Sequence, residues 1–199
     1  INPKNLIGVD DFNQSFFDKI DEIEVAISNE IGLRLDLPYM WQLLDSVNDR
    51  YSSLSNIINT DVSVNNRSTH SITFNQRKLG SVTDLGKSNT IISLTKLCNN
   101  WSTKNNLKNI FYSTFESPGH LQLLIGTKGL IKLRQGHTEL ALFLTNLAQL
   151  TPVVIMCEML DGHTFDSRSV EDCKKIAEQN KFLFLESETL IKYYYDQKI

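Results

Sequence analysis

Three stretches of the chain place apolar residues three or four positions apart, the spacing of one face of a helix. They run from 39 to 58, from Ser88 to about Asn100 and from Thr138 to Leu150. Each predicts a helix whose apolar face packs on the core. Ser88 and Thr138 are suitable caps, because a hydroxyl at a helix start accepts a hydrogen bond from an unpaired backbone N–H.

Two further helices are predicted near the C-terminus. Ser169 and Asp172 have the spacing of a capping box, in which the side chain of each residue accepts a hydrogen bond from the backbone N–H of the other. A helix should therefore begin there and run through Asn180. A last helix is expected from Ser187 to Tyr195.

Strands are predicted where apolar residues alternate with polar ones or form a short run. The predicted strands are residues 71–74, 121–125, 130–133, 153–159 and 182–185. A hairpin turn is expected at Gly126–Gly129 and another turn at Ser117–His120, because glycine and proline favour turns. The run from Val153 to Met159 is almost continuously apolar, which predicts a strand at the centre of a sheet.

The chain has the organisation of one domain. No internal repeat, low-complexity tract or linker divides its 199 residues, and a hydrophobic content of 41% is enough for one sizeable core. The sequence therefore predicts a single domain over residues 1–199 of the α+β class, in which helices and a mixed sheet form a layered α/β sandwich.

Charge and cysteine content exclude several classes of protein. The net charge is -3 with both signs mixed along the chain, so neither nucleic acid nor a membrane surface is an expected partner. No apolar run approaches the roughly 20 residues that span a bilayer. Cys98, Cys157 and Cys173 are an odd number without C-x-x-C spacing, which indicates neither a disulfide framework nor a zinc site. A cytoplasmic location is expected.

The segment Arg134–Glu139, which reads RQGHTE, carries the most informative chemistry. It lies where a helix should begin, and a helix start offers unpaired N–H groups and partial positive charge to an anion. Gly136 lets the backbone approach a ligand, and Arg134 has a planar fork that matches phosphate oxygens. His137 has a nitrogen for a divalent ion or for proton transfer. The alternative reading is a solvated helix cap with a surface ion pair.

The same segment, followed by a helix and then by Pro152-x-x-x-x-Cys157-Glu158-Met159, resembles the signature of the 3,4-dihydroxy-2-butanone 4-phosphate synthases. Further segments resemble family elements in the same order: Leu37–Met40, His70–Phe74, Ser117–His120 and Leu190–Tyr194. The resemblance covers nearly all of the chain from about residue 23 and is archaeal in character.

The resemblance implies a homodimeric lyase of riboflavin biosynthesis. It would convert D-ribulose 5-phosphate to L-3,4-dihydroxy-2-butanone 4-phosphate and formate, with magnesium or manganese as cofactor. His137 would hold the metal, and Glu158 would be catalytic, as a carboxylate partly removed from water that shuttles protons, with His120 in support. The implied substrate-binding residues are Arg134, Gln135, Gly136, Thr138 and Glu158. The alternative for Glu158 is a salt-bridged glutamate at a strand end.

Two departures from the family pattern keep other functions open. The family's acidic loop, of the type D-x-x-D-R-E-x-E-x-D, is not found, and it would fall before Ile1. Gly86-Lys87 replaces the family's Asp-Arg, and a lysine cannot copy the bidentate grip of arginine. A catalytically weak or inactive member that binds or senses sugar phosphates is therefore the alternative. A structural domain without a ligand ranks last.

Overall fold

The computed structural model describes residues 23–47, 49–53, 57, 67–77, 84–161, 164 and 166–197. Its centre is a four-stranded sheet in the order β2-β3-β1-β4. The strands are β1 (Glu24–Ile27), β2 (His70–Gln76), β3 (Phe115–Ile125) and β4 (Val153–Met156). β1 pairs parallel with β3 and antiparallel with β4, and β2 pairs antiparallel with β3. The predicted mixed sheet is confirmed.

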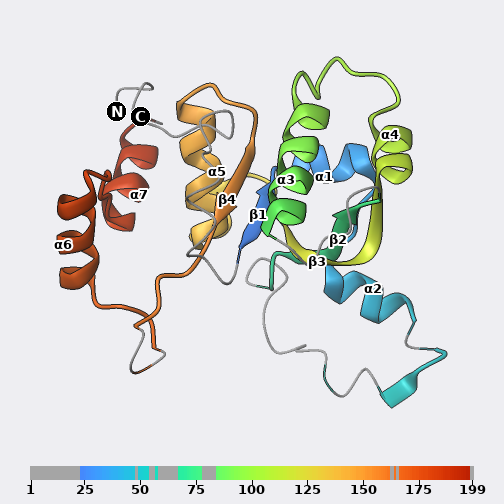
Figure 1. Cartoon of the computed structure of the whole chain (residues 1–199), viewed down its shortest axis with the longest axis horizontal. Helices are drawn as coiled ribbons and strands as arrows, with labels where there is room; N and C mark the ends of the chain where they lie inside the picture. The colour runs from blue at the N-terminus through green and yellow to red at the C-terminus, as the bar shows by residue number, and fades with distance from the viewer. Residues whose placement is uncertain are drawn as a thin grey trace.

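Helices cover both faces of this sheet, as Figure 1 shows. The helices are α1 (Asn29–Leu35), α2 (Met40–Ser46), α3 (Asp84–Cys98), α4 (Leu107–Thr114), the 3-10 helix η6 (Leu130–Lys132), α5 (His137–Leu147), α6 (Val170–Asn180) and α7 (Ser187–Asp196). Val25 and Ile27 of β1 face the larger core cluster, with residues of α1, α3 and α4. Ala26 faces the other way, toward Leu142 of α5. This alternation makes the α/β sandwich that the sequence predicts.

The strand at the centre is not the one that the sequence predicts. β4 ends at Met156 and lies at one edge, whereas β1 and β3 occupy the middle of the described sheet. β1 spans four residues, of which the last three are fully buried. A run that short carries too little pattern to be recognised, although both of its faces are covered.

Two other predicted strands are wrong. Residues 130–132 form η6, and Leu133 is its C-cap. Gly129, just before η6, has a left-handed φ of 83°, which turns the chain out of extended geometry. Residues 182–185 join no sheet in the described part of the chain. The predicted turn at Ser117–His120 lies within β3, with a cis peptide bond between Ser117 and Pro118.

The predicted helix starts have different outcomes. Ser88 does not cap its helix, because α3 begins at Asp84 and Ser88 lies buried inside it. Ser169 caps α6 by accepting a hydrogen bond from the backbone N–H of Asp172 at 3.2 Å, as the sequence predicts. Of the helix expected over residues 39–58, the structure describes the part that forms α2. No residue of α2 is buried, so the prediction that this helix faces the core is wrong. Leu54 and Ile58 lie outside the described residues.

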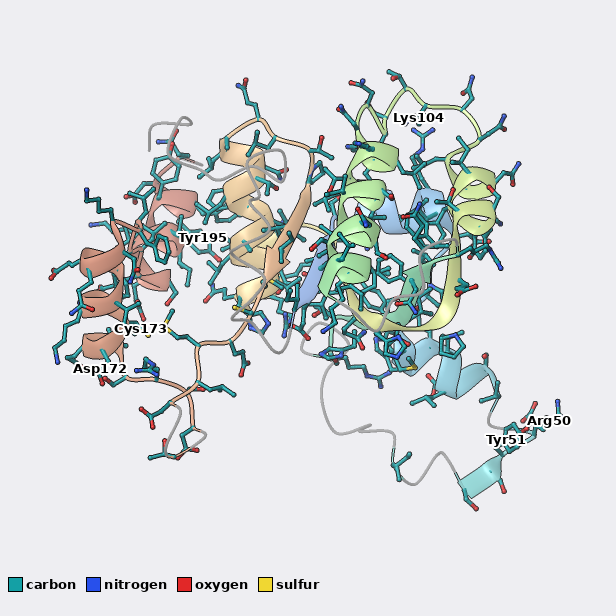
Figure 2. The ribbon with its side chains drawn as sticks, in the orientation of Figure 1. Arg50, Tyr51, Lys104, Asp172, Cys173 and Tyr195 are labelled. Carbon is teal, nitrogen blue, oxygen red and sulfur yellow. The ribbon has the colours of Figure 1, made fainter. Side chains whose placement is uncertain are left out.

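α6 and α7 form a separate layer beyond α5. Figure 2 shows Asp172 and Cys173 on α6 and Tyr195 on α7, on the opposite side of the molecule from Lys104. The ring of Phe143 on α5 meets that of Tyr194 on α7 edge to face, with centroids 5.4 Å apart. Aromatic contact thus ties α7 to the sandwich.

Candidate functional site

The RQGHTE segment lies at the start of α5, as the sequence predicts. Gly136 is the N-cap and has no side chain to accept a hydrogen bond from the first turn. Within the described part of the chain, no residue accepts a hydrogen bond from the backbone N–H groups of residues 137–139. These groups, with the positive end of the helix dipole, are suited to an anion.

Thr138 does not cap the helix, which corrects the prediction. It is fully buried in the first turn of α5, and its hydroxyl lies 3.2 Å from that of Thr69, just before β2. The capping position falls two residues earlier because the helix begins at His137. The hydroxyl pair joins the start of α5 to the β2 end of the sheet, and Thr69 is a contributor that sequence reasoning missed.

Arg134 lies across the helix start, held by a buried carboxylate. Its Nη1 donates to Oε2 of Glu139 at 2.5 Å, and its side chain is 20% exposed. A Cβ added at Gly136 would collide with this Nη1 and would lie 2.7 Å from Cζ. The absence of a side chain at Gly136 is therefore what lets the guanidinium occupy this place.

Tyr39 forms the neighbouring wall. Its hydroxyl donates to the carbonyl of Gly126 at 3.1 Å and accepts from the side chain of Asn29 at 3.3 Å. Burial is the main reason that the pKa of Tyr39 is raised, with a smaller opposing contribution from Asn29. The hydroxyl thus remains a proton donor at neutral pH. The Tyr39 ring stacks on the ring of Trp41. The guanidinium of Arg67 lies over the Trp41 ring, with its Cζ 4.7 Å from the ring centroid.

The remaining residues predicted for the site are largely exposed. His137 and Gln135 project from the helix start into solvent. Glu158, two residues beyond β4, is also exposed and makes no ion pair with a described residue. This corrects two expectations: the carboxylate is not withdrawn from water within one chain, and among the residues that the structure describes it has no salt-bridge partner.

His120 is held in place by β2. Its backbone N–H donates to Oδ1 of Asn75 at 2.8 Å, and the same amide's nitrogen lies 3.2 Å from the imidazole Nδ1. Glu24 pairs with Gln122 on one side and Met156 on the other. His120, within β3, and Glu158, beyond β4, therefore both lie toward the Glu24 end of β1, since β3 and β4 run in opposite directions.

The described residues do not by themselves complete a metal site. No three His, Cys, Asp or Glu side chains converge in the ranges that the structure describes. His137 has the right chemistry for one magnesium ligand, but a magnesium site is built mainly from oxygen atoms. Gly86 and Lys87, the departures from the family pattern, lie in the first turn of α3. No described helix is long and apolar enough to cross a membrane.

Taken together, the Arg134 guanidinium, the backbone at Gly136 and the first turn of α5 form a corner whose donors and partial positive charge suit an anion. Comparison with known sequences assigns the chain to a family. The family profile of 3,4-dihydroxy-2-butanone 4-phosphate synthase matches residues 18–193. The chain belongs to the 3,4-dihydroxy-2-butanone 4-phosphate synthase family.

Archaeal relatives are similar over most of their length. A protein of Methanothermobacter thermautotrophicus named 3,4-dihydroxy-2-butanone 4-phosphate synthase is 34% identical over 171 residues, which are 85% of this chain and 72% of that one. A protein of Archaeoglobus fulgidus with the same name is 28% identical over 194 residues, covering 96% of this chain and 81% of its own.

Solved structures support the fold. The Candida albicans 3,4-dihydroxy-2-butanone 4-phosphate synthase superposes with a TM-score of 0.66 at 22% identity, over 96% of this chain and 80% of that one. A second synthase structure, described as a complex with two magnesium ions, gives 0.65 at 15% identity over 98% and 82% of the two chains. The predicted α+β sandwich of this family is thereby confirmed.

Proposed function

We propose that this protein is a carbon–carbon lyase that converts D-ribulose 5-phosphate to L-3,4-dihydroxy-2-butanone 4-phosphate and formate. Membership of the family supports this assignment. The observation that carries it is the placement of the Arg134 guanidinium over Gly136, at a helix start whose first-turn N–H groups have no described acceptor. An arginine fork and a helix start together suit the phosphate of a sugar phosphate.

Phosphate binding would fix the sugar relative to the remaining residues. Gln135 and His137 flank Gly136 and are exposed, so both can reach a bound ligand. Thr138 contributes its backbone N–H, because its hydroxyl lies against that of Thr69. Holding the phosphate converts the later proton transfers into reactions within one bound complex, which lowers their barrier.

The reaction needs proton abstraction next to a carbonyl and stabilisation of the negative charge that develops on oxygen. Glu158 is the proposed proton carrier, and His120 a supporting one. A divalent metal, magnesium or manganese, would supply electrophilic stabilisation when bound, with His137 as a ligand. The described side chains do not form a full ligand set.

We further propose one domain over residues 1–199, a homodimer and a cytoplasmic location. The exposed apolar run at residues 182–185 supports the dimer, since a large exposed apolar patch often marks a protein interface. Sedimentation of the whole protein measures this directly: a single species of monomer mass would contradict it.

The test of the activity is formate release. The whole protein is incubated with D-ribulose 5-phosphate and magnesium, with a chelator as one control. Glu158→Gln should lower the rate roughly 100- to 10,000-fold, the usual contribution of a positioned acid or base. Glu178→Gln, on the exposed face of α6, is the matched control and should leave the rate unchanged.

The histidine has its own comparison. Formate release that falls with His137→Ala and with the chelator, but not with His70→Ala, would support the metal role of His137. His70 is the control because it is a histidine on β2 and not in the RQGHTE segment. Its Nε2 lies 3.6 Å from Oε1 of Glu24. A folded protein that binds phosphate but releases no formate would contradict the lyase and leave a sugar-phosphate-binding protein.

A further inference from the structure

We infer that Glu139 is a positioning residue, which acts on the phosphate of the substrate by holding the guanidinium of Arg134 over the start of α5. This inference rests on the proposed function for its ligand. It assigns a role to a side chain that cannot itself touch that ligand, because Glu139 is fully buried.

The two oxygens of Glu139 are used for different partners. Oε1 accepts from the backbone N–H of Thr127 at 3.0 Å, in the segment that follows β3. Oε2 accepts from Nη1 of Arg134 at 2.5 Å. A carboxylate removed from water is strongly destabilising unless it is paired and hydrogen-bonded, so both partners are needed. One buried group therefore fixes the loop, the arginine and the helix start relative to one another.

The pair leaves Arg134 able to bind a ligand. Glu139 engages Nη1, and the part of the chain that the structure describes offers no other hydrogen-bond acceptor to this guanidinium. The group has further N–H donors in a rigid plane. The guanidinium lies against Gly136, where an added Cβ would be 2.7 Å from Cζ, and movement away from this place would break its ion pair with Glu139. A pre-oriented fork loses less entropy when an anion binds.

A pair that only stabilised the fold would have the same geometry, so the test measures anion binding. Inorganic phosphate is the probe, and its affinity for the whole protein is measured by calorimetry for wild type, Glu139→Gln, Arg134→Ala and the double variant. Phosphate binding needs no turnover. A failure of the lyase assignment would therefore leave this result readable.

Arg134→Ala is expected to weaken phosphate binding on the order of 10- to 100-fold, since hydrogen bonds to charged groups are strong. Glu139→Gln should weaken it about tenfold, the size typical when the partner behind a ligand-binding side chain is lost. In the Arg134→Ala background Glu139→Gln should have little further effect, because its action passes through the arginine.

Kinetics give a second readout if formate is released. Glu139→Gln should raise KM for D-ribulose 5-phosphate by a similar factor and change kcat less, since the phosphate is remote from the reacting carbons. Glu139→Asp keeps the charge but is too short to reach both partners. Glu139→Asp replaces Glu139→Gln if the glutamine variant does not fold, and the same loss of phosphate affinity is expected. Glu178→Gln should match wild type.

The inference is overturned if Glu139→Gln, or its aspartate replacement, folds and binds phosphate as wild type does. It is equally overturned if the effects of the two substitutions add in the double variant, or if the wild-type protein does not bind phosphate at all. Loss of phosphate affinity that disappears in the Arg134→Ala background supports it, whether or not formate is released.

Discussion

The region around β1 to β3 and the region of α6 and α7 are built in different ways. In the first, the strands and helices α1, α3 and α4 share one continuous buried cluster that includes three aromatic rings. In the second, Ala177 and Leu190 are the buried residues among those described in the two helices, and residues 182–185 between them are 39% to 61% exposed. The first is held by burial and the second largely by local contacts.

This difference indicates where the free energy of unfolding resides. Buried apolar area is the main stabilising contribution to a fold, whereas exposed ion pairs contribute little. The α6–α7 region is joined internally by contacts such as that of Lys174 with Glu186 at 2.6 Å, both of which are half exposed. Opening of this region should therefore cost less than opening of the sheet.

The largest expected effect is the loss of an aromatic ring from the sheet core. Phe74 is fully buried, with its ring centroid 5.5 Å from that of Phe115 and 6.2 Å from that of Phe111. Phe74→Ala should lower the free energy of unfolding by about 3–5 kcal/mol, because it leaves a cavity that the neighbours cannot fill. Urea unfolding followed by circular dichroism measures it.

The matched control replaces the same residue type in the other region. Phe184 is 39% exposed and lies beside the ammonium of Lys174, 5.3 Å from its ring centroid. Phe184→Ala should cost less than Phe74→Ala, on the order of 1–2 kcal/mol, since part of its ring is already in water and no closed cavity is left. Equal losses for the two variants would show that burial does not distinguish the regions.

Cysteine reactivity gives an intermediate effect without any mutation. Burial raises the pKa of the Cys98 thiol, on α3, to about 12, whereas Cys173 on α6 is only partly buried. The thiolate is the reactive form, so at pH 8 Cys98 should be alkylated roughly 100-fold or more slowly than Cys173. Mass spectrometry of peptides after a timed iodoacetamide reaction reads both sites. Comparable rates would mean that the α3 region opens as readily as α6.

The smallest effect concerns the cap of α6. Ser169→Ala removes the hydroxyl that accepts from the N–H of Asp172, at a cost of about 1 kcal/mol. Amide exchange should speed up in α6 and stay unchanged in α3, and uniform acceleration over the whole chain would contradict local opening.

The same cap predicts a pH dependence. The hydrogen bond from Ser169 and the neighbouring Lys175 hold the pKa of Asp172 below its ordinary value of 3.8. The stability that this carboxylate contributes is therefore present above its unfolded-state pKa and is lost as the pH falls through its folded-state pKa. The protection factors of the α6 amides, which correct each exchange rate for its intrinsic dependence on pH, should fall at the acidic end of a series from pH 6 to pH 2.5. In Ser169→Ala this fall should begin at a higher pH.

Sequence reasoning succeeded where the signal is local. The start of α6 follows from two residues, because a capping box is complete within one helical turn. The grouping of Arg134, Gly136 and His137 at a helix start was also foreseen, since these residues are consecutive or nearly so, whereas their role in anion binding stays a prediction. It failed for β1, which is four residues long, and for the role of Thr69, which depends on a partner 69 residues away.

Glu139 illustrates the limit most clearly. From the sequence it is an acidic residue in the first turn of a helix, a common place for a solvated side chain. Its burial depends on Thr127 and on the segment after β3, which reaches it only when the sheet forms. Leu142, three residues further on, is buried on the same side of α5, but a carboxylate one turn before an apolar residue does not by itself indicate burial.

The sequence by itself determined the capped start of α6 and the helix that follows the RQGHTE segment, since each depends on residues close together in the chain. It also determined the family resemblance, which needs only short motifs in a fixed order. Only the tertiary structure decided that β1 and β3 are central, that β4 is at the edge and that Glu139 is buried behind Arg134. The physical reason is that strand order and burial depend on which surfaces meet, and contacts between distant segments are not encoded in any single stretch of sequence.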